Sequence, residues 1–144
     1  MEFLRLLESL RTPVLSALML AITELGDQSV FMLLAAVLFW CVDKRQGCYV
    51  LVAAGVGTVA NQWLKLLFRI PRPWVLDPGF TIVEGARAAA QGYSFPSGHT
   101  QNVVATFGCV FALNRNRRLR AFCALVIVLV PFSRMYLGVH TPKD

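Results

Sequence analysis

Long runs of apolar residues, interrupted by short polar segments, form most of the chain. Three of the stretches without any charged side chain are 19, 15 and 13 residues long and cover residues 46–64, 28–42 and 121–133, respectively. An ionised side chain left in hydrocarbon costs about 2.5–3.5 kcal/mol on insertion scales, so such runs are typical of membrane helices. Because Arg120 and Arg134 can extend toward the interfaces, we expect the last helix to cover about residues 119–139 and to reach roughly 30 Å.

The pattern predicts an all-α, polytopic transmembrane helical bundle that starts with a helix lying on the membrane surface. Residues 2–11 place their large apolar side chains on one helical face, which indicates an interfacial helix. Thr12 and Pro13 suit the N-cap and first residue of the next helix, and Asp27 is expected to cap the one after it. About five core helices are expected, over residues 13–25, 28–42, 48–70, 96–113 and 119–139. Turns are expected at 43–47 and 114–118, and a loop at 73–95.

Composition narrows the class of protein further. Hydrophobic residues make up 56% of the 144 positions and charged residues 15%, with a mean hydropathy of +0.58. These values are too apolar for a disordered chain or for an ordinary soluble surface. A soluble all-α protein with buried helices is the alternative. We expect one domain over residues 1–144, with residues 1–12 as the interfacial helix and residues 13–144 as the helical core.

The net charge of +6 would suit a nucleic-acid partner, but the distribution of the charges argues against one. A nucleic-acid-binding domain usually presents its Lys and Arg on a solvated face, whereas here they interrupt apolar runs. The four cysteines form no CxxC pair and lie at no metal-ligand spacing from a histidine, so no metal site is predicted. We therefore expect membrane lipids, and no nucleic acid, as partners.

The distribution of Lys and Arg also predicts an orientation in the membrane. The turns at 43–47 and 114–120 hold six of them and the N-terminal segment two, against six on the opposite side of the bundle. If Lys65, Arg72 and Arg134 lie on that opposite side for a functional reason, the count becomes eight against three. The positive-inside rule then places the two basic turns in the cytoplasm. Lys65 and both histidines would face outward, and we expect a bacterial plasma (inner) membrane.

Three polar clusters interrupt the apolar chain, and the predicted topology brings all of them to one membrane face. The first contains Lys65, Arg69 and Arg72, spaced four and three residues apart, which places them near one face of a helix. Such a cluster can bind phosphate. A solvated or lipid-headgroup-binding basic cluster is the alternative.

The second cluster, Ser97-Gly98-His99, opens a helix after Pro96. Exposed backbone N–H groups at a helix N-terminus form a ready anion site, and the Ser97 hydroxyl adds a donor. The alternative is an N-cap with an incidental histidine.

The third cluster combines Ser133 and Arg134 with His140 and Asp144. The Thr and Pro that follow His140 suit the start of a new helix, which would place Asp144 in its first turn and within reach of His140. A carboxylate there can hold the imidazole in one tautomer and stabilise its cationic form. Taken alone, such a pair is more often structural.

Together, these clusters supply the parts that phosphoryl transfer requires. Two histidines, one of them paired with an acid, three basic side chains and a helix N-terminus provide donors for the equatorial oxygens, a nucleophile and an acid for the leaving oxygen. No acidic cluster is present in the sequence to hold Mg²⁺, so the cations must be the side chains themselves. The sequence therefore predicts a metal-independent phosphohistidine route without a cofactor.

The same residues resemble a known set of signature motifs. Lys65-x6-Arg72-Pro73, Pro96-Ser97-Gly98-His99 and Ser133-Arg134-x5-His140-x3-Asp144 are similar, at all eleven positions, to the three motifs of the type 2 phosphatidic acid phosphatase superfamily. That superfamily includes membrane lipid phosphatases, bacterial acid phosphatases and vanadium haloperoxidases. The resemblance covers residues 65–144. It implies an integral membrane phosphatase that hydrolyses a lipid phosphate or diphosphate, of the phosphatidic acid or polyprenyl diphosphate type, through a phosphohistidine intermediate.

The resemblance also implies a role for each residue. His140 is the expected nucleophile, Asp144 its orienting partner, and His99 the general acid that also assists water in dephosphorylation. The expected phosphate-binding set consists of Lys65, Arg72, Ser97, Gly98 and Arg134. Arg69 is expected just outside this set or in contact with the lipid headgroup.

The membrane branch of the superfamily implies a six-helix bundle with its site near the outer leaflet. Since its members continue through a final helix after the last Asp, we expect a sixth helix beyond Asp144 and interpret the chain as truncated at its C-terminus. Two alternative functions remain. One is a phosphotransferase or a phosphatase of soluble esters that uses the same site, and the other is a non-catalytic membrane protein that binds anionic lipid through its basic cluster.

Overall fold

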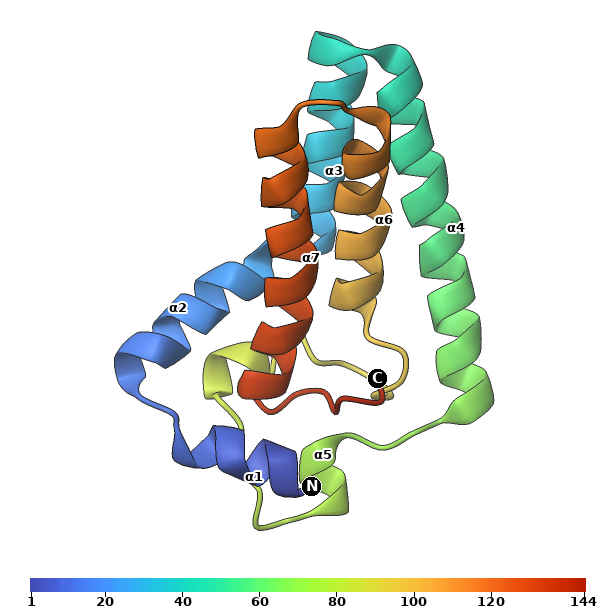
Figure 1. The fold of residues 1–144 in the computed structure, drawn as a ribbon. Helices are drawn as coiled ribbons and strands as arrows, with labels where there is room; N and C mark the ends of the chain where they lie inside the picture. The colour runs from blue at the N-terminus through green and yellow to red at the C-terminus, as the bar shows by residue number, and fades with distance from the viewer.

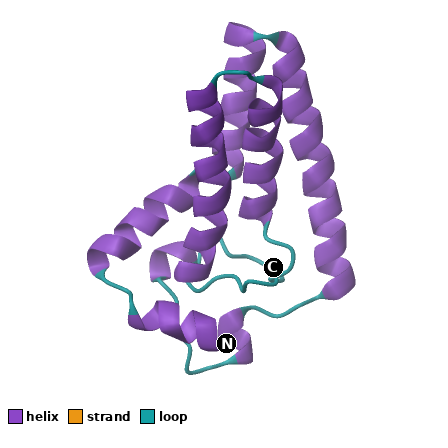
Figure 2. Cartoon of the chain, in the orientation of Figure 1, coloured by secondary structure: helices purple, strands orange, loops and turns teal.

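The apolar runs form helices, and most of the irregular chain collects at one end of the molecule (Figures 1 and 2). The computed structural model describes residues 1–144 and contains no β-strand, which confirms the predicted all-α class. The α-helices are α1 (Glu2–Ser9), α2 (Pro13–Glu24), α3 (Gln28–Val37), α4 (Lys44–Phe68), α5 (Pro73–Leu76), α6 (Gly98–Leu113) and α7 (Arg117–Tyr136). A π-helical turn, η1 (Leu38–Val42), continues α3, and a 3₁₀ turn, η2 (Glu84–Ala86), lies in the loop after α5.

Four helices, α3, α4, α6 and α7, stand side by side and enclose the main core, with α6 packed against both α4 and α7 (Figure 1). Its buried side chains include Phe31, Ala35, Val50, Ala54, Val103, Phe107, Val126 and Val130. The helices approach closely where residues are small, since a Cβ on Gly57 of α4 would lie 2.1 Å from Gln101 Nε2 of α6. This close approach brings the C-terminal half of α4 beside the first turns of α6, where two of the three motifs lie.

Side-chain caps set the helix starts and move two predicted boundaries. Thr12 and Asp27 cap α2 and α3 as predicted, each by accepting a backbone N–H from the first turn. Asp43 caps α4 in the same way, so the helix begins at Lys44, four residues earlier than predicted, and the five-residue basic turn expected there is wrong. The second basic turn is also shorter than predicted, because Asn116 caps α7.

The predicted interfacial helix is present as α1 and lies across the loop end of the bundle (Figure 1). Leu4 and Leu7 are buried against Phe80 of the loop after α5, whereas Phe3 on the same helix is half exposed. α1 therefore covers part of the loop with one side and leaves apolar side chains free on another.

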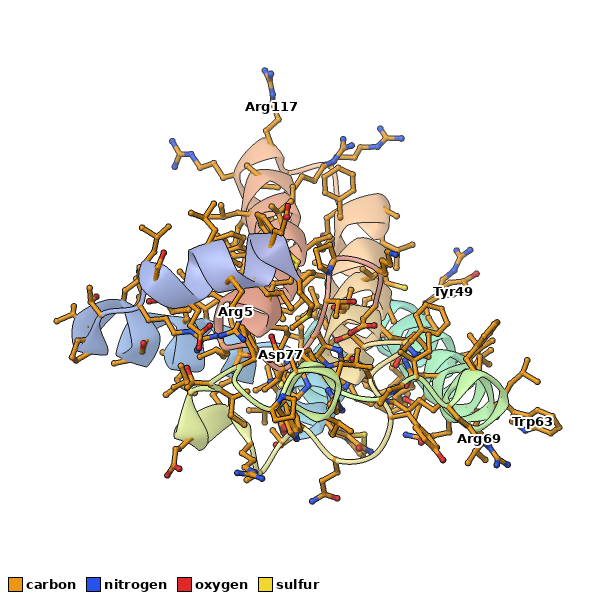
Figure 3. The ribbon with its side chains drawn as sticks, turned by 90° about the horizontal axis from the view of Figure 1, so that it is seen from below. Arg5, Tyr49, Trp63, Arg69, Asp77 and Arg117 are labelled. Atoms are coloured by element: carbon orange, nitrogen blue, oxygen red, sulfur yellow. The ribbon has the colours of Figure 1, made fainter.

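The position of α1 changes the charge count used to predict orientation. Arg5 pairs with Asp77, and Arg11 Nε donates to the carbonyl oxygen of Tyr136 at 2.9 Å, so both arginines lie at the loop end (Figures 1 and 3). Grouping them with the basic turns was wrong, because these contacts hold the N-terminal segment at the opposite end. The count becomes six Lys and Arg at the basic turns against eight at the loop end. Once Lys65, Arg72 and Arg134 are set aside, it is six against five.

Two segments, Lys44–Leu76 and Arg117–Tyr136, are long and apolar enough to cross a membrane, and α1 with α2, bent by 120°, is a third candidate. The outer surface of α4 suits lipid contact, because most of its exposed side chains are apolar, among them Val52, Val56, Val59, Trp63 and Leu67. Trp63 points away from the bundle (Figure 3) and is 74% exposed. The helical surfaces are thus those of a membrane protein.

Candidate active site

A cavity of about 730 Å³ opens at the loop end of the bundle, between α4, the first turns of α6 and the loop after α5. Five of the eight predicted site residues line it, namely Lys65, Arg72, Gly98, His99 and His140. A second cavity of about 180 Å³ is lined by the other three, Ser97, Arg134 and Asp144. Because His140 borders both cavities, the structure gathers the other seven predicted residues around its imidazole.

His140 is buried and contacted on both sides of its ring. Its Nδ1 lies 3.2 Å from Asp144 Oδ2, the contact that the sequence predicts, and its Nε2 lies 2.9 Å from Arg72 Nη1. An ionised carboxylate can only accept and a guanidinium can only donate, so this network assigns the imidazole proton to Nδ1 and the lone pair to Nε2. The neutral imidazole presents a nucleophilic nitrogen beside a cation.

Burial keeps His140 in this neutral form. It lowers the pKa of His140 to about 4, and the positive charges of Arg72 and Arg134 act in the same direction, while Asp144 opposes them. A histidine whose pKa lies well below 7 is unprotonated at neutral pH, as a nucleophile must be.

Asp144 is held by three donors. Its Oδ2 accepts hydrogen bonds from His140 Nδ1, from the Thr141 N–H at 2.7 Å and from the Ser94 hydroxyl. Burial alone would raise the pKa of this carboxyl, but the three hydrogen bonds lower it to about 2. The Asp144 N–H also donates to the Thr141 carbonyl oxygen at 3.1 Å, so these residues form a turn. Residues 141–144 form a turn and no helix, and the helix predicted to begin at Thr141 stays a prediction.

Arg72 is positioned by loop backbone and not by a helix. Its guanidinium donates to the carbonyl oxygens of Gly92, Val139 and Gln91 at 3.1, 2.9 and 2.8 Å, in addition to His140 Nε2. Four of the five N–H donors of the side chain are thus engaged. The loops that hold Arg72 fix its charge at the edge of the larger cavity.

The expectation that Lys65, Arg69 and Arg72 share one helix face is wrong. α4 ends at Phe68, and Arg69 caps it in the left-handed conformation with a φ of 47°. The Arg69 side chain then turns outward at the edge of the molecule (Figure 3), and its Nε donates to the carbonyl oxygen of Leu66. Arg69 lines neither cavity.

Lys65 lies in the last turns of α4 and points into the larger cavity, where its Nζ donates to the Tyr93 carbonyl oxygen at 2.8 Å. One turn earlier, the buried Asn61 side chain donates to the Pro96 carbonyl oxygen at 3.4 Å. These contacts tie the first motif to the loop and turn that carry the second motif.

The second motif forms the predicted turn and helix start. Ser97 caps α6 by accepting the Thr100 N–H at 3.4 Å, and its own N–H donates to the Asp144 carbonyl oxygen at 3.2 Å. A Cβ on Gly98 would approach no non-neighbouring atom more closely than 4.0 Å, so the backbone there faces open space. His99 faces the larger cavity and makes no side-chain hydrogen bond.

Arg134 is 1% exposed and reaches the smaller cavity from α7. Its guanidinium donates to Thr23 Oγ1 at 3.2 Å and to the Ala89 carbonyl oxygen at 3.5 Å, while its Nε has no partner. An unpaired buried donor costs about 1–3 kcal/mol, so this N–H is available for an anion.

The sequence did not predict three residues that support the site, Ser94, Thr23 and Asn61. Ser94 lies just before the second motif. Its fully buried hydroxyl indicates a role at the site only once the structure shows Asp144 beside it. Thr23 and Asn61 lie on helices without any distinguishing spacing. Their partners come from distant parts of the chain, which a linear pattern does not disclose.

The donors gathered here suit an anion. No group of three or more His, Cys, Asp or Glu side chains comes together in the chain. Instead, three basic side chains, the imidazole of His99 and the N-terminus of α6 surround His140. This is a set of hydrogen-bond donors with positive charge, the chemistry that recognises a phosphate group.

Comparison with known proteins decides the family. Residues 46–144, more than half of the chain, match the PAP2 superfamily. The chain belongs to the PAP2 superfamily. This is the type 2 phosphatidic acid phosphatase superfamily that the three motifs resemble, so the prediction made from them is confirmed.

Two crystal structures share the fold of this chain. Aquifex aeolicus LpxE is 27% identical with a TM-score of 0.83, and the alignment covers 99% of this chain and 83% of that one. A transmembrane PAP2 type phosphatidylglycerolphosphate phosphatase from Bacillus subtilis is 26% identical with a TM-score of 0.74, covering 95% of this chain and 70% of that one. These similarities confirm a helical membrane-phosphatase fold.

The chain is also similar in sequence to the undecaprenyl-diphosphatase BcrC of Bacillus subtilis (strain 168). The two are 31% identical over 135 residues, which cover 91% of this chain and 66% of that protein. The chain thus spans about two thirds of the length of this relative.

Proposed function

We propose that this protein is an integral membrane phosphatase that hydrolyses a lipid phosphate or diphosphate through a phosphohistidine intermediate. The observation that carries the proposal is a neutral His140 whose Nε2 lies 2.9 Å from Arg72 Nη1, at the edge of a cavity lined by cations. Membership of the PAP2 superfamily supports it, as do the names of two relatives, an undecaprenyl-diphosphatase and a phosphatidylglycerolphosphate phosphatase. Residues 1–144 act as a single phosphatase domain.

In the first step, the lone pair of His140 Nε2 attacks the phosphorus atom. The N–P bond forms as the P–O bond to the lipid breaks, and His99 gives a proton to the departing oxygen. The lipid leaves as an alcohol, or as a monophosphate when the substrate is a diphosphate. Asp144 stabilises the positive charge that develops on the imidazole, as the carboxylate of a Ser-His-Asp triad does.

In the second step, water attacks the phosphorus atom and the N–P bond breaks. His99, neutral after the first step, takes a proton from the attacking water. Inorganic phosphate leaves, and both histidines return to their starting protonation states.

The phosphate-binding set holds the three equatorial oxygens: Lys65, Arg72, Ser97, Gly98 and Arg134. Arg72 Nη1 donates to His140 Nε2, and a phosphate oxygen that accepted this N–H would free the lone pair for attack. Arg134 Nε, buried without a partner, gains one when an anion occupies the smaller cavity. These cations do the work of a metal ion, so the reaction needs neither metal nor cofactor.

The substrate is a lipid that stays in the membrane while it reacts. The larger cavity lies at the end of the candidate spans, at the same end of the bundle as the half-exposed α1. Once Lys65, Arg72 and Arg134 are set aside, the basic turns hold six Lys and Arg against five at the loop end, so the positive-inside rule favours a site at the non-cytoplasmic face of the plasma membrane by a single residue.

Phosphate release by the purified protein in detergent tests the proposal, with phosphatidic acid and a polyprenyl diphosphate as substrates. His140→Ala should lower kcat by about 10³-fold or more, because it removes the nucleophile. Arg72→Gln should also reduce activity strongly. Its matched control is Arg69→Asn, which removes an exposed cation outside both cavities and keeps a residue that tolerates positive φ. Unchanged release by His140→Ala would overturn the proposal.

Further measurements separate the remaining alternatives. Activity should persist in EDTA, and its loss would contradict the metal-independent mechanism. Higher rates on water-soluble esters than on lipids would identify a phosphatase or phosphotransferase of soluble esters. Binding to anionic vesicles without turnover, retained when both histidines are replaced, would identify a non-catalytic lipid-binding protein.

A further inference from the structure

A stripe of polar side chains runs along the part of α4 that lines the larger cavity. It consists of four residues, Thr58, Asn61, Gln62 and Lys65. Spacings of three and four residues place them on one face of the helix. Because an α-helix rises about 1.5 Å per residue, Thr58 lies about 10 Å from Lys65 along the axis, away from the loop end. The cavity is therefore polar well beyond the residues assigned to the phosphate.

α6 closes the cavity at the far end of this stripe. Gln101, one turn after Gly98, lines the cavity, and its Nε2 donates to the Ala54 carbonyl oxygen of α4 at 3.5 Å. Ala54 itself belongs to the apolar core that fills the space between the helices beyond this contact. The polar stripe thus ends where the core begins.

The cavity is larger than a phosphate group requires. Its volume of about 730 Å³ falls within the range of about 300–1,000 Å³ that is typical of clefts for whole drug-sized ligands. Arg72 and His140, where the phosphate is expected to react, lie at the loop end. The space beside Thr58 and Gln62 is therefore left for the part of the substrate that follows its phosphate.

Thr58 and Gln62 need a physical reason to be polar. Both lie within the candidate membrane span Lys44–Leu76, and neither side chain makes a hydrogen bond in the protein. Asn61 differs from them, because its contact with the Pro96 carbonyl oxygen accounts for its amide. Polar side chains within membrane spans face cavities and mark the path of a substrate. The free hydroxyl and the free amide are thus candidates for contact with the lipid.

Gln62 lies where the cavity meets the lipid-facing surface of α4. Trp63, the next residue, points away from the bundle (Figure 3) and is 74% exposed. Val59 and Leu66, one turn on either side of Gln62, are also exposed, and Leu66 lines the cavity as well. A lipid with its hydrocarbon chains on this surface and its phosphate beside His140 would carry its linkage region past Gln62.

The charges around the cavity indicate which linkage fits. Besides the two histidines, the charged side chains that line it are Lys65, Arg72 and Asp27. Both cations belong to the phosphate-binding set. A second phosphate beside Thr58 and Gln62 would find no further cation and would share the cavity with the Asp27 carboxylate, which repels it. Uncharged donors there suit uncharged acceptors.

We propose that Thr58 and Gln62 donate hydrogen bonds to the ester carbonyl groups of a glycerol-based lipid monophosphate and thereby select this class of substrate. The inference rests on the proposed phosphatase function and narrows its substrate. In such a lipid the ester carbonyls follow the phosphate after a short chain of single bonds. This separation fits Gln62 and Thr58, which lie about 4.5 and 10 Å from Lys65 along the helix axis. A polyprenyl diphosphate has no carbonyl group.

Two lipids that differ only in these carbonyls test the proposal. Dioleoyl phosphatidic acid has ester carbonyls, and its dialkyl ether analogue of equal chain length has none. With the purified full chain in mixed micelles, we expect kcat/KM to be about 5- to 30-fold higher on the ester lipid, as one or two hydrogen bonds between uncharged groups would produce. A ratio near one would overturn the proposal.

Thr58→Val and Gln62→Met remove the hydrogen-bonding groups with little change in side-chain size. Each should lower kcat/KM on the ester lipid by about 3- to 10-fold and leave the rate on the ether analogue within about twofold. Thr58→Ser keeps a hydroxyl and should restore most of the wild-type ratio. Equal losses on both lipids, or an unchanged ester-to-ether ratio in the double variant, would overturn the proposal.

Thr106→Val is the matched control on α6. The Thr106 hydroxyl is buried without a partner and lines neither cavity, so its removal should keep the wild-type ester-to-ether ratio. A polyprenyl diphosphate provides a second control, and its hydrolysis by Thr58→Val and Gln62→Met should stay within about twofold of wild type. A loss there as large as on the ester lipid would place a second phosphate beside these residues and overturn the proposal.

A binding measurement separates this proposal from the proposed function. His140→Ala protein cannot form the phosphohistidine, and displacement of a fluorescent phosphatidic acid from it measures affinity without turnover. The ester lipid should displace the probe at lower concentration than the ether analogue, and adding Gln62→Met should reduce the difference. Equal displacement by both lipids would overturn the proposal. Absence of turnover by the wild-type protein on every substrate would instead overturn the proposed function.

Discussion

The proton on His140 decides whether the site can work as proposed. The chain contains two histidines, so His99→Gln leaves His140 to be observed alone by ¹⁵N NMR. We expect a neutral ring protonated at Nδ1 at pH 7, because Asp144 accepts from Nδ1 and Arg72 donates to Nε2. Since burial lowers the pKa to about 4, the cation should appear only as the pH falls toward that value. A midpoint near 6.5 or an Nε2–H tautomer would contradict the assignment.

Asp144 and Ser94 form a chain of hydrogen bonds behind the nucleophile. Asp144→Asn should lower kcat by about 10²–10⁴ with little change in KM, since the amide can present an N–H to the ring and favour the wrong tautomer. Ser94→Ala removes one of three donors to the carboxylate and should lower kcat by roughly 5- to 30-fold, since a hydrogen bond to a charged group contributes about 1–2 kcal/mol. Steady-state phosphate release on phosphatidic acid measures both. A larger loss of kcat for Ser94→Ala than for Asp144→Asn would contradict the proposal that Ser94 acts on His140 through Asp144.

Residue types and short spacings made most of the candidate site predictable. His140 and Asp144 stand four residues apart, and such a separation limits where the carboxylate can lie. Ser94, Thr23 and Asn61 escaped prediction because each contacts a partner that is between 35 and 111 residues away in the chain. A polar residue in a helix or loop acquires such a role only through the tertiary fold.

At the scale of single helices, capping chemistry decided which boundaries could be predicted. Thr12 before Pro13, and Asp27 after the preceding glycine, gave correct helix starts. Asp43 is an equally strong cap, but the charged residues after it predict a turn by their polarity, although Lys and Arg are good helix formers. The end of α4 was harder to predict, because Arg69 adopts a left-handed conformation that favours Gly or Asn.

α1 packs on the loop that positions Arg72. Truncating a buried side chain of α1 should therefore lower the stability of the protein. Leu4 is fully buried against the loop, so Leu4→Ala should lower the free energy of unfolding by about 2–4 kcal/mol. Leu6, 58% exposed on the same helix, is the control, and Leu6→Ala should change stability by less than about 0.5 kcal/mol. Thermal or denaturant unfolding in detergent measures both. Equal effects of the two variants would mean that α1 does not pack on the loop in solution.

At the scale of the whole molecule, the fold turns three separated motifs into one site. The antiparallel order of α4, α6 and α7 puts the end of α4, the start of α6 and the end of α7 at the same end of the bundle (Figure 1). This convergence was predictable for α6 and α7, since the short turn between them makes these neighbours antiparallel. The placement of α1 was not, because the contacts of Arg5 and Arg11 with distant residues draw the N-terminal segment to the loop end.

That placement leaves the charge count near parity, so the orientation of the bundle deserves a direct test. Single cysteines report on each end, in a background where Cys41 and Cys48, the exposed native cysteines, are replaced by Ser. Glu84→Cys lies in the exposed loop at the site end, and Arg115→Cys in the exposed turn between α6 and α7. With the site outside, an impermeant maleimide should label Glu84→Cys in intact cells and Arg115→Cys only after permeabilisation. The reverse pattern would place the site in the cytoplasm. If the site is outside, six basic residues face the cytoplasm and five basic residues that do not belong to the site face outward. Adding two Lys at the site end should then reverse this small excess and produce a mixed labelling pattern.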